Sequence, residues 1–483
     1  MQFNSYVFIL AFLPAVVALY YLIGKINQEL GKLVIILGSL FFYAYTDIAT
    51  LKIMGISILI NYLFVKLIDK TKWKKTFMAV PVIINVLLLL YFKYTNFVIL
   101  NINAWFSRQF ELKELILPLG ISFFTFQQIA YVVAVFRNEI EVKVIDYVAY
   151  ILYFPKLLMG PLMDPVDFVS QLNDSELRKF NLDNIACGIK IFSFGLLKKV
   201  LIADTFAKAV SWGFENIETA SSLDLILVML FYTFEIYFDF SGYSDMASGV
   251  SLMFNITLPI NFDSPYKADS IRDFWKRWHI SLTKFLTKYI YIPLGGSRKG
   301  ELFTYINTMI VFLISGIWHG ANWTFILWGI LHGAFSVLDR FIDKIPNPKN
   351  MFKHERGLLT FVVVNVLWLL FRAESVSQWS TMLKTIVSFN NMKITEGLIE
   401  NFIIPETDFL MDSFEFLNKL NNSVNGLMMY IFITVASVIC FIPENNYKKM
   451  RKLSFVGMIL SAVAFVWGVT CLGSESVFVY FNF

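Results

Sequence analysis

A long apolar stretch, interrupted by small and polar residues, constrains the fold more than any other feature of this sequence. It runs from Phe303 to Asp339, and its middle reads WHGAN at 318–322. About 16 residues separate Phe303 from His319, roughly 24 Å of helix, which is less than the ~30 Å apolar thickness of a bilayer. If two membrane helices flank this break, it lies at membrane depth, where non-helical backbone must pack against protein or line a wet cavity. The imidazole of His319 there predicts a functional site, with a buried histidine bonded to a neighbouring carbonyl as the alternative.

The composition extends this interpretation to the whole chain. Of 483 residues, 57% are hydrophobic and 16% are charged, whereas soluble domains hold about 25% charged residues. The apolar excess is spread along the chain, which predicts an all-α polytopic membrane protein without a large soluble domain. Three scattered cysteines show no metal-like spacing, so we expect neither a disulfide framework nor a metal site. There is no P-loop, dinucleotide fingerprint or zinc pattern, and the lysines flank apolar runs, so we expect membrane lipids and no nucleic acid as partners.

The apolar runs predict about eleven spans plus re-entrant and interfacial helices. The first four are expected at about 1–24, 31–46, 50–68 and 77–100, with an outer loop at 101–116. The positive-inside rule places the lysine-rich loop 66–75 in the cytoplasm and the N-terminus outside, in a multi-pass protein of the cytoplasmic membrane. Residues 153–165, with three prolines and a glycine, predict a broken or re-entrant element. We expect one domain over 1–483, made of N-terminal spans (1–100), a core (101–372), a polar excursion (373–425) and C-terminal spans (426–483).

Residues 270–290, SIRDFWKRWHISLTKFLTKYI, predict a basic amphipathic helix. Apolar residues recur at helical spacing and the cations lie off this stripe. Ser270 and Asp273 form a capping-box pattern at its start. Such a helix, rich in Trp and Phe, is typical of the membrane interface, here on the cytoplasmic side because of its basic face. His279 lies at the border of the stripe, where a functional imidazole and a satisfied interfacial histidine are both open.

Carboxylates also occur inside an apolar run. Glu235 and Asp239 are four residues apart and share a helix face. Asp245 lies one turn beyond Ser241, the first residue of SGYS, which contains Tyr243 and is expected to kink the helix. Proton relay, capping of a broken helix and binding of a basic partner are all open. We favour a structural role for Asp239, Tyr243 and Asp245.

These features leave two classes of membrane protein open. One is a transporter with a polar substrate path, and the other is a membrane enzyme with an imidazole in a cavity. Asn322 and Ser315 face the same side as His319 if helix persists locally. Trp318 and Trp323 can wall a pocket there. Three small residues are expected to leave room for a ligand: Gly316, Gly320 and Ala321. An imidazole can take the proton of an attacking hydroxyl and an amide can stabilise an oxyanion, which favours acyl transfer.

Several segments resemble the membrane-bound O-acyltransferase family, in particular its alginate O-acetyltransferase branch. They are FDFSGYSDMA (238–247), DFWKRWHISL (273–282), YIPLGG-RKG (291–300) and GIWHGANWTFILWG (316–329). LPLGISFFTFQ, the FP-LL-GP element, WLLFRAES (368–375) and the terminal YFNF fit as well, so the resemblance covers nearly the whole chain. His319 matches the family's catalytic histidine and His279 its second recurring histidine. The oxyanion role of Asn322 is our own inference.

The resemblance implies a helical body around a central tunnel, with no resident cofactor. It implies an O-acetyltransferase that takes acetyl from cytosolic acetyl-CoA for a cell-envelope polysaccharide, either alginate-like or peptidoglycan. An extracytoplasmic acetyltransferase partner would complete the transfer. We expect four cations to attract the phosphates of CoA: Lys276, Arg277, Arg298 and Lys299. D-alanyl transfer to teichoic acid and transport of a glycan precursor stay open as alternatives.

Overall fold

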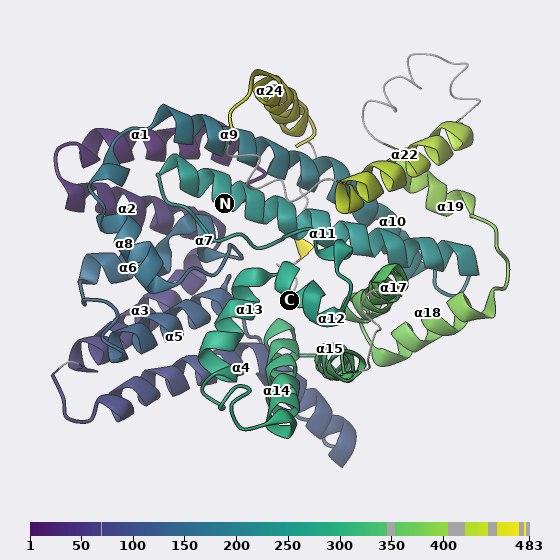
Figure 1. The fold of residues 1–483 in the computed structure, drawn as a ribbon, viewed down its shortest axis with the longest axis horizontal. Coiled ribbons are helices and arrows are strands. Elements are labelled where there is room, and N and C mark those ends of the chain that lie inside the picture. Colours follow the sequence, from purple (N-terminus) through teal and green to yellow (C-terminus); the bar gives the residue numbers. More distant parts are fainter. Residues whose placement is uncertain (69, 345–352, 404–420, 443–451, 473–477, 480–483) are drawn as a thin grey trace. The chain divides into compact units, whose positions relative to one another are not determined.

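The fold is that of a computed structural model, which describes residues 1–68, 70–344, 353–403, 421–442, 452–472 and 478–479 (Figure 1). Regular structure within these residues is helical. Seven helices are long and apolar enough to cross a membrane: α2 (Gln28–Thr46), α3 (Ile48–Ile68), α4 (Lys74–Phe106), α14 (Glu301–His319), α15 (Trp323–Ile342), α17 (Lys353–Arg372) and α22 (Asn421–Phe441). Three shorter apolar helices are Phe8–Gly24, α5 (Ile121–Phe136) and α24 (Phe455–Thr470). The first of them combines a π-helical turn (Phe8–Phe12) with α1 (Leu13–Gly24). The all-helical, multi-pass membrane fold is confirmed, whereas the expected number of spans stays a prediction.

The chain divides into two compact units. The first comprises Met1–Ser193, Tyr243–Pro259 and Met450–Ala462, and the second comprises Phe194–Gly242, Ile260–Lys449 and Val463–Phe483. The single domain expected over 1–483 therefore stays a prediction. The YFNF terminus lies outside the described residues.

In the first unit, the N-terminal helices pack in chain order. Helix α1 (Leu13–Gly24) contacts α2, α3 contacts α4, and α4 contacts α5 (Figure 1). Helix α4 continues to Phe106, so the outer loop expected from residue 101 begins later, where Ser107 adopts the left-handed conformation that ends the helix. Three short helices complete this part: α6 (Val144–Leu152), α7 (Phe154–Leu157) and α8 (Pro165–Asn173).

The proline-rich element is broken, as expected. Helix α7 is a single turn, and the chain then runs without helix to α8 while staying buried. Lys156 is fully buried; its Nζ donates to Gln127 Oε1 and to the Tyr150 carbonyl, and lies 3.9 Å from the centre of the Tyr150 ring. These contacts hold irregular backbone inside the unit, which is the condition for such backbone in a membrane protein.

One segment before the central hairpin differs from the sequence expectation. Helix α9 (Leu182–Leu197), a π-helical turn (Lys198–Ala203) and α10 (Asp204–Glu215) follow one another directly, and α11 (Ser222–Met253) is continuous. The kink expected at SGYS is therefore wrong. Gly242 instead permits a close contact, because a Cβ there would lie 2.8 Å from the Gly195 carbonyl oxygen.

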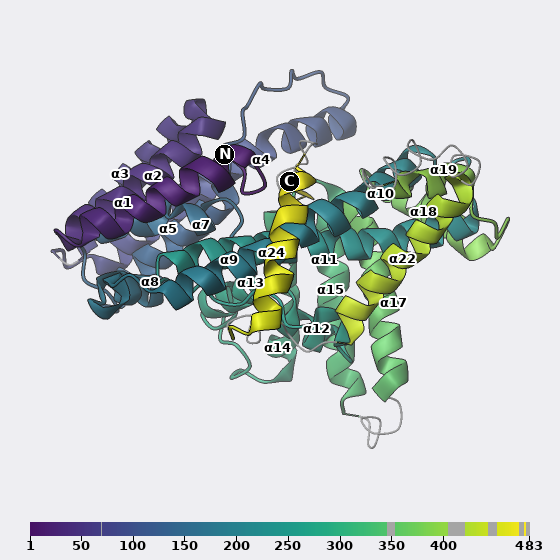
Figure 2. The same ribbon diagram turned by 90° about the horizontal axis from the view of Figure 1, so that it is seen from above.

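The second unit also holds α12 (Ile271–Arg277), α13 (Ile280–Leu286) and the hairpin of α14 and α15. Helix α15 runs alongside α17 (Figure 2). The described part of the predicted polar excursion includes α18 (Val376–Ser388) and α19 (Glu396–Ile399), and the latter contacts α22.

Candidate active site

The break predicted in the long apolar stretch is present at Gly320–Asn322. Helix α14 ends at His319, and α15 begins at Trp323. Asn322 caps α15: its Oδ1 accepts from Thr324 N at 3.1 Å, and its Nδ2 donates to the Glu374 carbonyl at 2.8 Å. The amide that we expected to stabilise an oxyanion is thus engaged at the start of a helix. Its oxyanion role stays a prediction.

The glycines around this break hold the helices together and do not leave room for a ligand, so that expectation is wrong for Gly316 and Gly320. A Cβ on Gly316 would lie 2.4 Å from the Phe325 carbonyl oxygen, and one on Gly329 would lie 2.5 Å from the Phe312 carbonyl oxygen. A Cβ on Gly320 would collide with the Phe325 ring at 2.1 Å. Small residues let two membrane helices approach closely, and α14 and α15 use them in this way.

His319 is buried in an aromatic cage. The centre of its ring lies 4.9 Å from that of Trp318, 5.2 Å from that of Trp328 and 5.2 Å from that of Phe371. These rings come from α14, α15 and α17, so three helices fix the imidazole. Trp318 walls the site as expected, but the side chain of Trp323 is 46% exposed. The buried wall is made by Trp328 and Phe371 in its place.

His279 lies at a break between α12 and α13, not within one amphipathic helix. It has φ +45, in the left-handed region, so the single helix expected over 270–290 is interrupted at this residue. The apolar positions of the predicted stripe are nevertheless the buried ones, from Ile271 to Leu286. Ser270 Oγ caps α12 by accepting from Asp273 N at 3.1 Å.

The protonation state of His279 follows from its partners. Asn261 Oδ1 accepts from Ser281 N at 3.2 Å and from Ser281 Oγ at 2.9 Å, and it lies 3.1 Å from His279 Nδ1. The Nδ1 atom therefore donates, which leaves Nε2 as an acceptor that has no hydrogen-bond partner among the described residues. Burial lowers the pKa of His279 to about 3. The ring is thus neutral near pH 7. Its centre lies 6.3 Å from that of Trp318, whose indole also contacts His319.

A third histidine, His332 of α15, was missed by the sequence analysis. It is fully buried, its Nδ1 accepts from Trp275 Nε1 at 3.1 Å, and its ring centre lies 4.6 Å from that of Trp328. This hydrogen bond joins α12 to α15. The signal was available, because a histidine inside a membrane helix is rare and marks a functional position by default.

Three of the four cations expected to bind CoA phosphates lie at the surface, and the fourth has a carboxylate partner. The side chains of Lys276, Arg298 and Lys299 are exposed, and Arg277 donates to Asp273 Oδ2 at 2.8 Å. Their role stays a prediction.

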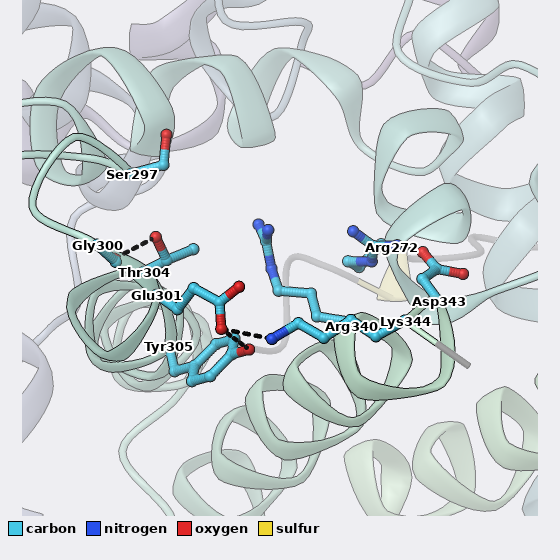
Figure 3. Close-up of a pocket in the computed structure, with 9 residues that line it drawn as sticks. All are labelled: Arg272, Ser297, Gly300, Glu301, Thr304, Tyr305, Arg340, Asp343 and Lys344. Atoms are coloured by element: carbon cyan, nitrogen blue, oxygen red, sulfur yellow. Dashed lines mark hydrogen bonds and ion pairs between the residues drawn. The ribbon is translucent and has the colours of Figure 1, made fainter. Parts of the chain in front are cut away.

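Other cations meet at a pocket of about 320 Å³ beside the first turn of α14 (Figure 3). It is lined by Arg272, Ser297, Gly300, Glu301, Thr304, Tyr305, Arg340, Asp343 and Lys344. Lys344 pairs with Glu301, and Arg272 with Asp343. Arg340 extends into the pocket, and none of the described carboxylates forms an ion pair with it. The pocket therefore offers one uncompensated guanidinium to an anion.

Two of the polar residues expected to be structural, Asp239 and Tyr243, have buried contacts within their units. Asp239 accepts from Lys199 Nζ at 2.7 Å and from Val479 N at 3.0 Å, and Lys199 also pairs with Asp204 at 2.9 Å. Tyr243, in the other unit, stacks on Phe3 at 5.0 Å. Asp245 is partly buried. A buried cation shared by two carboxylates suits a role in holding helices together.

The described residues thus form an all-helical membrane body with buried imidazoles at and near a helix break, an arrangement that favours a membrane-embedded enzyme. Comparison with known proteins narrows this class. The model of the membrane-bound O-acyltransferase family matches residues 134–376. The chain is 36% identical to a peptidoglycan O-acetyltransferase of Helicobacter pylori, over 100% of this chain and 97% of that protein.

Two further relatives match smaller parts of this chain. A probable alginate O-acetylase of Pseudomonas putida is 37% identical over 82% of each chain. A teichoic acid D-alanyltransferase of Streptococcus thermophilus is 28% identical over 54% of this chain and 70% of its own length. The chain thus belongs to the membrane-bound O-acyltransferase family and is an acyltransferase, which confirms the resemblance found in its motifs.

Proposed function

We propose that this chain transfers acetyl groups from acetyl-CoA for the O-acetylation of a cell-envelope polysaccharide, either peptidoglycan or an alginate-like polymer. The observation that carries the proposal is the full-length similarity to a peptidoglycan O-acetyltransferase, together with equal identity to an alginate O-acetylase over most of the chain. Both kinds of acceptor present hydroxyl groups to an activated acyl donor, so one reaction type serves both.

In the proposed reaction, His319 is the general base. It takes the proton of the acceptor hydroxyl while the oxygen attacks the thioester carbonyl carbon, and the tetrahedral intermediate collapses with cleavage of the carbon–sulfur bond. The departing thiolate takes the proton back from the imidazolium, so atoms and charge balance. His279, neutral and close to the same Trp318 indole, supplies a second buried nitrogen acceptor that can orient the hydroxyl.

The donor would approach from the cytosolic side of the inner membrane. The lysine-rich loop 66–75 supports this orientation, with the N-terminus outside. The pocket with Arg272, Arg340 and Lys344 suits the phosphates of CoA better than the exposed cations first expected. Along α15, Arg340 and Trp328 are about 18 Å apart. The extended arm of a CoA molecule whose phosphates are bound in this pocket could therefore reach the aromatic cage of His319. An extracytoplasmic acetyltransferase would complete delivery to the polymer.

The alternatives receive less support. The D-alanyltransferase relative is less similar and matches about half of this chain. Membership of an acyltransferase family disfavours transport of a glycan precursor as the main activity.

The test uses inside-out membrane vesicles supplied with labelled acetyl-CoA, and compares the wild-type chain with His319→Ala and His319→Gln at equal expression. We expect acetyl-CoA consumption to fall at least 100-fold in both variants, because the base is lost. Size-exclusion profiles in detergent control for folding. Undiminished turnover in the variants would move the base elsewhere, and transfer of a D-alanyl group with no use of acetyl-CoA would replace the proposed donor.

A further inference from the structure

One face of α15 carries polar atoms that the protein leaves without partners. Thr324, Trp328, His332 and Ser336 are spaced four residues apart, so they share this face, and each side chain is at most 1% exposed. Within the described residues, Thr324 Oγ1, Trp328 Nε1, His332 Nε2 and Ser336 Oγ have no hydrogen-bond partner. An unsatisfied buried polar group costs about 1–3 kcal/mol, and native proteins hold few of them. The hydroxyls of Thr324 and Ser336 lie at the two ends of this face, and the two central groups, Trp328 Nε1 and His332 Nε2, indicate an occupant.

The two central groups are both hydrogen-bond donors. An indole Nε1–H can only donate. In His332, Nδ1 accepts from the indole of Trp275, so the proton of the neutral ring is on Nε2. Trp328 and His332 therefore present two N–H groups one helical turn apart, with 4.6 Å between ring centres. An atom of the occupant that bonds to both N–H groups must accept two hydrogen bonds.

A carbonyl oxygen fits this requirement better than water. Water would accept both bonds but would also have two protons to place, and three of the rings around this pair, Phe312, Trp368 and Phe371, offer no acceptor. A carbonyl oxygen accepts two bonds and has no proton. The site is also next to the base, because the Trp328 ring lies edge-on to the His319 ring with 5.2 Å between centres.

We propose that Trp328 Nε1–H and His332 Nε2–H bind the carbonyl oxygen of the acyl thioester and stabilise the negative charge it gains on attack. The inference rests on the proposed acetyl transfer and adds to it the place where the acyl group is held. When the hydroxyl oxygen bonds to the carbonyl carbon, the π-electron pair moves to the oxygen between the two N–H groups. It returns when the carbon–sulfur bond breaks. The groups are preorganised by packing and by the Trp275 hydrogen bond.

The test removes one hydrogen-bond donor without changing the shape of the ring. Benzothienylalanine in place of Trp328, which has sulfur where the indole has N–H, should lower kcat for acetyl-CoA consumption about 100-fold. The KM for acetyl-CoA should change little, because the donor acts on charge that develops in the transition state. His332→Phe should show the same pattern, and His332→Gln a smaller loss, because an amide both accepts from Trp275 and donates.

Ser336→Ala is the matched control, one turn further along the same face, and should leave kcat unchanged. A second measurement needs no turnover: in a His319→Ala background, the infrared carbonyl stretch of bound ¹³C-acetyl-CoA should move to higher frequency when the Trp328 N–H is replaced.

Three outcomes would overturn the inference. They are an unchanged kcat in the benzothienyl variant, an unchanged carbonyl frequency, or an equal loss in Ser336→Ala, which would make the face a structural or water-filled feature. A wild-type chain that consumes no acetyl-CoA when partner and polymer are supplied would instead reject the proposed donor, and the inference with it.

Discussion

At the scale of single residues, His279 shows how burial fixes the chemistry of a side chain. Two observations, the acceptor Asn261 Oδ1 at Nδ1 and full burial, make the ring neutral and its Nε2 an acceptor. The sequence placed this histidine at the edge of an amphipathic stripe, where solvent would set its pKa near 6.5. The turn at positive φ brings it inside instead.

This burial predicts a pH dependence of stability. The pKa of His279 is about 3 in the folded chain and about 6.5 when unfolded, so below pH 6.5 the unfolded chain binds a proton that the folded chain does not. Stability should therefore fall by about 1.4 kcal/mol per pH unit between pH 6.5 and 3, and this contribution should be constant above pH 6.5. Melting temperatures in detergent of wild type and His279→Gln should diverge across this window. Parallel curves would show that His279 does not titrate in this way.

At the scale of elements, the hairpin of α14 and α15 depends on glycines that permit contact of the two backbones. Gly316→Ala places a Cβ 2.4 Å from the Phe325 carbonyl oxygen, which belongs to backbone and cannot rotate away. We expect a loss of about 1–3 kcal/mol in stability, and a fall in activity because His319 shifts with α14. The measurement is a thermal melt in detergent alongside acetyl-CoA turnover.

Gly55→Ala is the control, because a Cβ at Gly55 of α3 would meet no atom within 4 Å. Alanine is the better helix former, so this variant should melt at the same temperature or slightly higher. If Gly316→Ala were equally well tolerated, the backbones of α14 and α15 would have to be further apart at Gly316 than the structure shows.

The two short helices α12 and α13 show what helical periodicity can predict about this chain and what it cannot. Helical periodicity correctly selected the buried positions on both sides of His279, because the stripe resumes after one residue in the left-handed region. It could not reveal the break itself. His279 is not a glycine, and Asn261, which accepts its hydrogen bond, is 18 residues away in sequence.

At the scale of the whole molecule, the topology makes a prediction that concerns the bilayer. Helix α4 is 33 residues long, about 50 Å, so its ends should lie on opposite sides of the membrane. A membrane-impermeant thiol reagent should label Gln109→Cys in intact cells and Thr71→Cys only after lysis. The wild-type chain, in which Cys187 and Cys440 are buried and Cys471 is partly exposed, is the background control. The reverse pattern would invert the proposed orientation and place the donor side outside.

The sequence determined the class of this protein because class depends on composition and local pattern. Apolar runs of membrane length and the small and polar residues of WHGAN each act through neighbours in the chain, and they were sufficient for the all-helical membrane fold and the break beside His319. The family followed from the resemblance of several short motifs, which are local as well. The buried positions around His279 followed from helical spacing for the same reason.

Tertiary structure alone decided which distant residues share a site. The contacts of His319 with Trp328 and Phe371, and the hydrogen bond from Trp275 to His332, join residues on different helices, and no periodicity encodes such pairs. The same holds for the glycines: a missing side chain in the sequence is consistent with space or with contact. Only the position of the neighbouring backbone, 2.4 Å from where a Gly316 Cβ would be, decides for contact.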